Sequence, residues 1–207
     1  RPIVNEYVEI LWACMKKLWP GLERKPRQFH IYLSHDVDVP YQYALTTLPQ
    51  LGRVTAGALI KHQNPQQAIG HVRLWSKVRA GDLNADPFNT FDWLMTLSEK
   101  HGIKSAFYFI THRTDTHKDG NYNIRHPLIR YLIRQISTRS HEIGLHPSFN
   151  TYLDAEQTLR EFEILKQICA EEGVHQQHWG GRQHYLRWQN PTTWANWDKA
   201  GLSYDST

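Results

Sequence analysis

The chain has 207 residues, 40% of them hydrophobic and 21% charged, which is typical of a globular domain with a buried core. Its formal net charge is only +4 and no lysine- or arginine-rich run is present, so the composition does not favour nucleic-acid binding. No apolar stretch approaches the ~20 residues that span a membrane. Cys14 and Cys169 lie far apart, so neither a disulfide framework nor a cysteine metal site is indicated. Because the chain starts at Arg1 and not at methionine, we expect it to be a piece of a longer protein.

The N-terminal segment predicts a helix that is separate from the rest of the chain. Residues 3–19 read as an amphipathic helix that a Pro-Gly pair ends. A short basic linker comes next, and an apolar, β-prone run then predicts a strand at about 29–35. We therefore expect an N-terminal helix and linker over 1–28 and a catalytic domain over 29–207.

Two carboxylates separated by one valine come directly after the predicted strand. Alternate side chains of a strand point to the same face, so Asp36 and Asp38 should share a face and Val37 should point away. Polar groups at the ends of parallel strands are where α/β folds build their sites. A surface turn with two solvated acids is the competing interpretation of this stretch.

The rest of the chain alternates helices with strands. Residues 41–86 carry apolar residues at helical spacing broken by Pro and Gly, which predicts a helical insertion. Hydrophobic periodicity then predicts helices at 91–100, 128–136, 153–172 and 191–200, and strands at 103–110, 142–145, 178–180 and 202–204. This alternation is typical of a parallel sheet or barrel.

A second candidate segment surrounds the predicted strand at 142–145. His146 falls at the strand's C-terminal end, and Asn150 comes four residues later. On one helical turn these positions are ~5–6 Å apart, so both side chains can reach one metal ion, although the amide oxygen is the poorer donor. Taken alone, His146 is better explained by a hydrogen bond within a turn, and we interpret His141 as structural.

A third candidate segment begins with two glycines. They allow a tight turn after the strand at 178–180. Arg182 then lies at a strand end, where its planar fork can hold a carboxylate in place. A lone arginine is normally a surface residue, so only the coincidence of three such strand ends favours a site.

These segments resemble the polysaccharide deacetylases, the NodB-homology domain of carbohydrate esterase family 4. Ser34-His-Asp36-Val-Asp38 resembles the family's aspartate motif at the end of strand one, and Ser140-His-Glu-Ile-Gly-Leu-His146-Pro-Ser-Phe-Asn150 resembles its histidine motif. Gly102 to Phe109 is similar to the family's G-[IV]-K-A-T-F-F strand, and Arg182-Gln-His-Tyr185 is similar to R-x-P-[FY]. The resemblance covers about 29–207. It implies an α/β fold, namely a distorted (β/α) barrel of the NodB-homology type that lacks its C-terminal end here.

The resemblance also implies roles for individual residues. Asp36 corresponds to the general base and Arg182 to the residue that orients it, whereas Asp38 and His146 correspond to metal ligands. Asn150 stands where the family usually carries a second ligand histidine.

The remaining roles concern the substrate. The backbone amide of Tyr185 corresponds to an oxyanion donor, and Tyr185 and Trp188 are expected to contact the sugar. The family's late L-x-H motif, which supplies a general-acid histidine, is not seen up to residue 207, and His184 is a candidate replacement.

The resemblance implies a hydrolase that removes acetyl groups from a carbohydrate with a divalent metal, zinc in the first place. The implied partner is a carbohydrate, with no nucleic acid and no membrane span in this segment. Two alternatives remain open. One is a glycan-binding domain on a decayed deacetylase fold, which the asparagine at position 150 favours. The other is a hydrolase of another carbon–nitrogen bond, because a fold does not fix a substrate.

Overall fold

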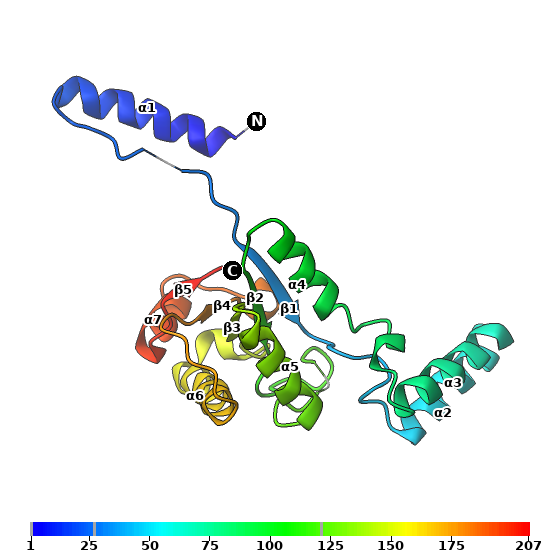
Figure 1. Ribbon diagram of the computed structural model, residues 1–207. Coiled ribbons are helices and arrows are strands. Elements are labelled where there is room, and N and C mark those ends of the chain that lie inside the picture. The colour runs from blue at the N-terminus through cyan, green and yellow to red at the C-terminus, as the bar shows by residue number, and fades with distance from the viewer. Residues whose placement is uncertain (1, 27, 121) are drawn as a thin grey trace. The chain divides into compact units, whose positions relative to one another are not determined.

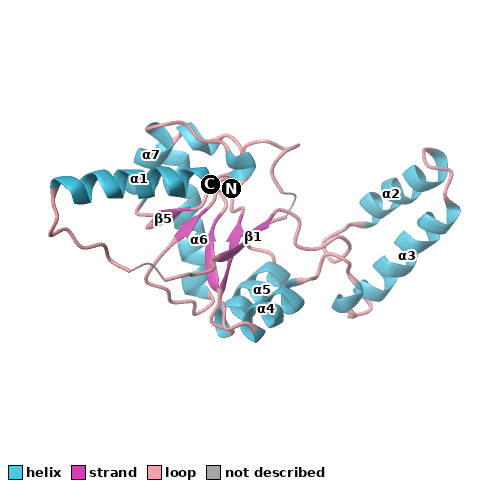
Figure 2. Ribbon diagram, turned by 90° about the horizontal axis from the view of Figure 1, so that it is seen from above, coloured by secondary structure: helices cyan, strands magenta, loops and turns pink. Residues whose placement is uncertain are grey.

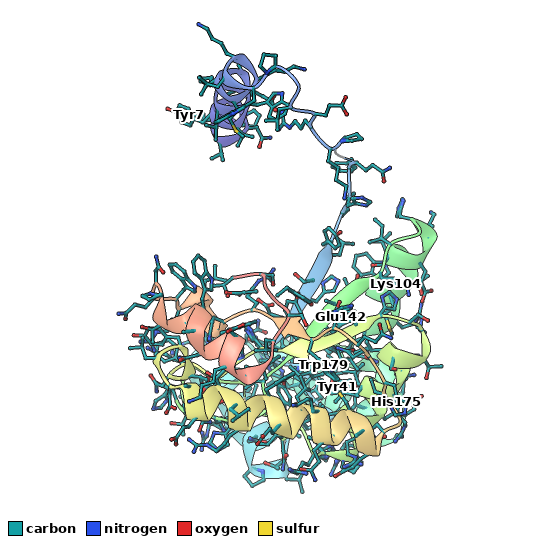
Figure 3. The ribbon with its side chains drawn as sticks, turned by 90° about the vertical axis from the view of Figure 1, so that its left-hand side faces the viewer. Tyr7, Tyr41, Lys104, Glu142, His175 and Trp179 are labelled. Atoms are coloured by element: carbon teal, nitrogen blue, oxygen red, sulfur yellow. The ribbon has the colours of Figure 1, made fainter. Side chains whose placement is uncertain are left out.

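The computed structural model describes residues 2–26, 28–120 and 122–207, and the chain divides into two compact units, Arg1–Ile31 and Tyr32–Thr207. The first unit contains helix α1 (Ile3–Leu18), which confirms the helix predicted there (Figure 1). None of its residues is buried, and Tyr7 is 68% exposed (Figure 3). Whether 1–28 and 29–207 act as separate domains stays a prediction.

The second unit is built on a parallel sheet. Its strands, which are shown in Figure 1, are β1 (Leu33–Val37), β2 (Ser105–Phe109), β3 (Glu142–Leu145), β4 (Gly180–Gly181) and β5 (Tyr204–Asp205). They are ordered β1-β2-β3-β4-β5, and every pairing is parallel. The register runs Val37, Phe109, Leu145, Gly181, Asp205, so the five C-terminal ends are aligned.

The order of the strands in the sheet, compared with their order along the chain, distinguishes a barrel from a doubly wound sheet. A doubly wound sheet reverses direction at a switch point, whereas a (β/α) barrel adds each strand on the same side of the last. The five described strands show no reversal. The fold is therefore α/β, with a curled parallel sheet of the kind expected for a distorted (β/α) barrel of the NodB type.

The first strand lies later in the sequence than predicted. It was expected at about 29–35, but β1 begins at Leu33 and ends at Val37. Phe29 is 87% exposed, and β2 offers no residue before Ser105 to pair with the segment preceding Leu33. The strand pairing that defines β1 therefore begins at Leu33, in the second half of the apolar run.

The other predicted helices are present within one to two residues of the expected ends. They are α4 (Phe91–Lys100), α5 (Pro127–Thr138), α6 (Ala155–Glu171) and α7 (Thr192–Ala200). The apolar stripe of α5 is completely buried, with Ile129, Leu132, Ile133 and Ile136 each no more than 1% exposed. Short 3-10 turns η2 (Thr151–Leu153) and η3 (His184–Leu186) follow β3 and β4. Within the described residues, no helix is both long and apolar enough to cross a membrane.

Between β1 and α4 the chain forms a helical hairpin. It consists of α2 (Leu48–Ile60) and α3 (Pro65–Arg79), followed by the turn η1 (Leu83–Ala85), and it extends away from the sheet (Figures 1 and 2). Asp86 fixes the base of this excursion. Its buried carboxylate accepts hydrogen bonds from the backbone N–H groups of Gln42, Tyr43, Ala44 and Phe88.

Candidate active site

Polar side chains from three strand ends line one cavity. Asp36 and Asp38 come from the end of β1, His146 follows β3, and Arg182 and His184 follow β4. The cavity measures about 710 Å³. Because the strand ends are in register, residues more than a hundred positions apart in sequence share this space. Val37 between the two aspartates is buried, as the strand alternation predicts.

The buried side chains of His146 and His184 approach each other through ring nitrogens that carry lone pairs. His146 Nδ1 lies 2.5 Å from the carbonyl oxygen of Arg182, and His184 Nε2 lies 2.9 Å from that of Lys118. A carbonyl only accepts, so each of these nitrogens must carry the hydrogen. The remaining nitrogens, His146 Nε2 and His184 Nδ1, are 2.9 Å apart. Two lone pairs at that distance require either an extra proton or a cation between them.

A carboxylate oxygen completes this cluster. Asp38 Oδ1 lies 3.4 Å from His146 Nε2 and 3.5 Å from His184 Nδ1. This oxygen is inaccessible to solvent and has no hydrogen-bond partner at normal distance. The neighbouring His146 lowers the pKa of Asp38 below its usual value, against an opposite effect of burial. We call Asp38, His146 and His184 the Asp-His-His cluster.

The chemistry of this donor set fits a divalent transition metal. One oxygen and two nitrogens lie within 4.8 Å of one another. Zinc takes imidazole nitrogens and carboxylate oxygens, and a ligating histidine usually donates its other N–H to a carbonyl or carboxylate. Both histidines do so here. A cation would also satisfy the orphaned Asp38 oxygen.

The other aspartate of the cavity, Asp36, is held by Arg182, although through a single hydrogen bond. Arg182 Nη1 donates to Asp36 Oδ1 at 3.1 Å. The other guanidinium donors bind the Ser34 hydroxyl at 2.8 Å and the Ser206 carbonyl at 3.0 Å. The expected pairing of Arg182 with Asp36 is therefore present, but the guanidinium divides its hydrogen bonds among Asp36, Ser34 and Ser206.

Asn150 is engaged outside the Asp-His-His cluster. Its side-chain oxygen accepts a hydrogen bond from Arg187 at 3.1 Å, and its amide donates to the carbonyl of Thr114 at 3.3 Å. It does not line the cavity. Residues 150 and 146 are not on one helical turn, because a turn and η2 come after the strand. The i, i+4 geometry on which the ligand pair was predicted is therefore wrong.

The turn after β4 brings His184 inward and leaves Tyr185 outward. Tyr185 and Leu186 have φ values of 57° and 52°, a left-handed conformation that costs side-chain-bearing residues of order 1 kcal/mol or more each. Tyr185 is 61% exposed and lines the cavity mouth. Trp188 does not line the cavity; its ring packs edge-on against Trp194, with centroids 4.8 Å apart.

Two buried carboxylates, those of Asp119 and Glu161, bind the backbone of the loop after His146. Asp119 accepts from the Phe149 N–H at 2.7 Å, and Glu161 accepts from the Ser148 N–H at 2.8 Å. Burial raises the pKa of Glu161, and hydrogen bonds from its neighbours oppose that effect. Sequence reasoning missed both. Asp119 lies between the predicted strand at 103–110 and the predicted helix at 128–136, where no site residue was expected, and Glu161 is one acid on a helix whose burial the sequence does not reveal.

Close backbone contacts explain two glycines near the cavity. A Cβ on Gly120 would lie 2.2 Å from the Asp38 carbonyl oxygen, and one on Gly181 would lie 1.8 Å from that of Leu145. Only glycine lets the chain approach these carbonyls. The first contact brings the Lys118–Asp119 loop against the end of β1, and the second sets β4 against β3.

A second cavity, of about 940 Å³, is lined by Lys104, Glu142 and His175, which are labelled in Figure 3. Burial raises the pKa of Glu142, whose carboxylate accepts a hydrogen bond from the Tyr204 hydroxyl. It is the larger cavity, but the Asp-His-His cluster does not line it. The strand-end cavity is therefore the candidate active site.

Comparison with known proteins identifies the family of the chain. A family profile described as "Polysaccharide deacetylase" matches residues 85–201, more than half of the chain. The chain belongs to the polysaccharide deacetylase family. The matched segment of this deacetylase-family chain includes His146 and His184, whereas the two aspartates of β1 precede it.

One solved structure is similar to this polysaccharide deacetylase domain. It is the Xyl-CE4 domain of a multidomain xylanase from the hindgut metagenome of Trinervitermes trinervoides, with 15% identity and a TM-score of 0.38. The similarity covers 52% of this chain and 47% of that one, so the chain matches about half of that structure's length. No curated protein sequence matches the chain.

Proposed function

We propose that this chain is a hydrolase that removes acetyl groups from a carbohydrate and uses a divalent metal, zinc in the first place. Membership of the polysaccharide deacetylase family supports the reaction and substrate class. The proposal of a metal ion rests on one observation. The lone pairs of His146 and His184 point at each other beside an oxygen of Asp38 that has no hydrogen-bond partner.

In this proposal the ligands come from three separate chain segments. Asp38 supplies an oxygen after β1, and His146 and His184 supply nitrogens after β3 and β4. His184 thereby takes the place that we expected Asn150 to fill, and it is no longer the candidate proton donor. A divalent cation held by these three residues would supply Lewis acidity, which polarises an acetyl carbonyl and lowers the pKa of bound water.

The other residues then act on water and substrate. Asp36 is the proposed general base, because a carboxylate at the cavity can accept a proton from an attacking water. Arg182 fixes its position through the 3.1 Å contact and is itself anchored by Ser34 and Ser206. Tyr185 is exposed at the mouth, where an aromatic face suits a sugar ring.

The test combines acetate release with metal content. We would incubate the protein with acetylated glycans, measure acetate, and determine bound zinc by mass spectrometry for wild type and Asp38→Asn. Asp198→Asn is the matched control, because Asp198 is exposed on α7 and does not line the cavity. We expect Asp38→Asn to lose both zinc and acetate release and Asp198→Asn to keep both.

Two results would contradict the proposal. Wild-type protein that binds acetylated glycans without releasing acetate, with zinc supplied, would instead support the glycan-binding alternative. Zinc binding that is unchanged in Asp38→Asn would remove the Asp-His-His cluster as the metal site.

A further inference from the structure

The hairpin formed by α2 and α3 carries an unusual charge. Between Val39 and Gly81 the sequence contains five lysines and arginines and no aspartate or glutamate. They are Arg53, Lys61, Arg73, Lys77 and Arg79, and all five are exposed. The whole chain has a formal charge of only +4, so this segment accounts for more than the entire net charge.

These cations are not used inside the protein. Among the residues that the structure describes, none of the five forms an ion pair with a carboxylate. Arg79 lies over the Trp75 ring, 5.5 Å from its centroid. Like charges on one hairpin repel each other, and an anionic partner would relieve that repulsion.

The same hairpin exposes aliphatic side chains. Ile60 at the end of α2 is 80% exposed, and Ile69 on α3 is 68% exposed. Leu48, Leu59 and Val72 are also exposed, at 67%, 48% and 44%. On α3, Ile69, Arg73 and Lys77 are placed at i, i+4 spacing, so apolar and cationic groups share one face.

The hairpin does not need this face for its own folding. Its two helices pack on each other, their buried residues include Leu51, Ala58 and Ala68, and Val78 of α3 joins the main hydrophobic core. The Trp75 indole N–H donates to the Thr46 carbonyl at 3.0 Å, which ties α3 to the hairpin base. The apolar and cationic face is therefore available for contact with another molecule.

The chemistry of this face selects among anionic partners. Sugar rings and nucleic-acid bases are held by exposed aromatic faces. The exposed apolar groups here are aliphatic, and the one tryptophan of the hairpin is half-buried and hydrogen-bonded. Helices that lie on a lipid surface combine lysine and arginine with exposed apolar side chains, aliphatic ones among them.

We propose that the α2–α3 hairpin binds the surface of an anionic lipid membrane. Its aliphatic side chains enter the boundary between headgroups and acyl chains, and its five cations contact the headgroups. The hairpin lies on the surface and does not span it. The sheet and its cavity would then be held next to the membrane, because the hairpin leaves the sheet directly after β1.

Vesicle co-sedimentation of the whole chain tests this. One set of vesicles is phosphatidylcholine alone, and the other contains about one third phosphatidylserine. Each lysine or arginine near an anionic surface contributes ~1 kcal/mol, or about fivefold in affinity. The triple variant Arg53→Gln, Arg73→Gln, Lys77→Gln should therefore bind the anionic vesicles about a hundredfold more weakly than wild type.

The matched control removes three exposed lysines elsewhere, as Lys16→Gln, Lys100→Gln, Lys199→Gln, and it should bind as wild type does. The double variant Ile60→Ser, Ile69→Ser should also weaken binding but keep its dependence on salt, because salt screens only the ionic part. Circular dichroism checks that every variant remains folded.

Several outcomes would overturn the inference. They are equal binding to both kinds of vesicle, an equal loss in the lysine control, and binding competed more effectively by a soluble acidic polysaccharide than by vesicles. Self-association that the Ile60→Ser, Ile69→Ser variant abolishes, without vesicle binding, would assign the face to a second copy of the chain. Acetate release from soluble glycan fragments separates this test from the proposed function, because it should be unchanged in all hairpin variants.

Discussion

Replacing Glu161 by glutamine should loosen the loop that carries His146 while leaving the shape of α6 unchanged. The Glu161 carboxylate is fully buried and accepts four hydrogen bonds. One oxygen accepts from the Ser148 hydroxyl, from Thr151 at 3.0 Å and from Gln157 at 2.8 Å, and the other accepts from the Ser148 N–H at 2.8 Å. Glutamine of the same size would have to place an NH₂ group against one of these donors.

If the glutamine oxygen stays on the Ser148 N–H, its NH₂ group faces the Gln157 amide, which cannot turn to accept because Arg160 binds its oxygen, whereas the two hydroxyls can rotate. An unsatisfied buried donor costs about 1–3 kcal/mol. With an m value of about 2 kcal/mol/M, the urea midpoint should fall by roughly 1 M. Ser148 is two residues from His146, so zinc affinity should also fall, by roughly the 10–100-fold typical of changes behind a metal ligand.

The assay is urea unfolding monitored by fluorescence, together with zinc titration of the folded protein. Glu163→Gln is the matched control, since Glu163 lies on the same helix two residues further along and is exposed. Its midpoint should stay within a few tenths of a molar of wild type. If Glu161→Gln unfolds at the same urea concentration as Glu163→Gln, the buried carboxylate does not hold the loop and this reasoning is wrong.

Three further predictions address the candidate site and the stability of the fold. Asp36→Asn should abolish acetate release, by at least about 100-fold, and keep bound zinc, because Asp36 is the proposed base and not a ligand; loss of zinc in this variant would reverse the two aspartate roles. His184→Gln should weaken zinc binding by at least about tenfold whereas Asn150→Ala should leave it unchanged, as zinc titration of both variants would show. The guanidinium of Arg139 holds the pKa of Glu99 at about 2, so this carboxylate stabilises the fold above its usual range near 4.5 and loses that effect as the pH falls toward 2. Acid unfolding of Arg139→Gln should therefore show a smaller decline of stability over that interval than wild type.

Strand alternation and helical periodicity predicted the parts of the site that regular structure determines. Asp36 and Asp38 flank a buried valine, and His146 and Arg182 come directly after strand ends. Each position is a consequence of a period of two along a strand and of the alignment of parallel strands. These local rules operate once a strand has a partner, and the pairing of β1 with β2 starts at Leu33, later than the apolar run alone indicates.

The position of His184 depends on backbone that no such period describes. Residues 185 and 186 turn with positive φ although neither is glycine, so the sequence contains no signal for the reversal. Burial of Asp119 and Glu161 was equally invisible, because an isolated acid in a loop or on a helix usually faces solvent. Such burial is decided by tertiary packing around the loop after His146.

The contacts of Asn150 and His184 change how the asparagine at position 150 is interpreted. On the family pattern it removes a ligand, and that favoured a decayed site. In the structure its side chain is bound by Arg187, and His184 stands beside His146 with a free lone pair. A decayed site would gain nothing from two buried histidines whose other nitrogens are both tied to carbonyls. Burying unpaired acceptors beside a carboxylate is costly, and a cation held among the three groups would offset that cost. In the proposed function, His184 therefore supplies the ligand that position 150 lacks, and the asparagine is no argument for a decayed site.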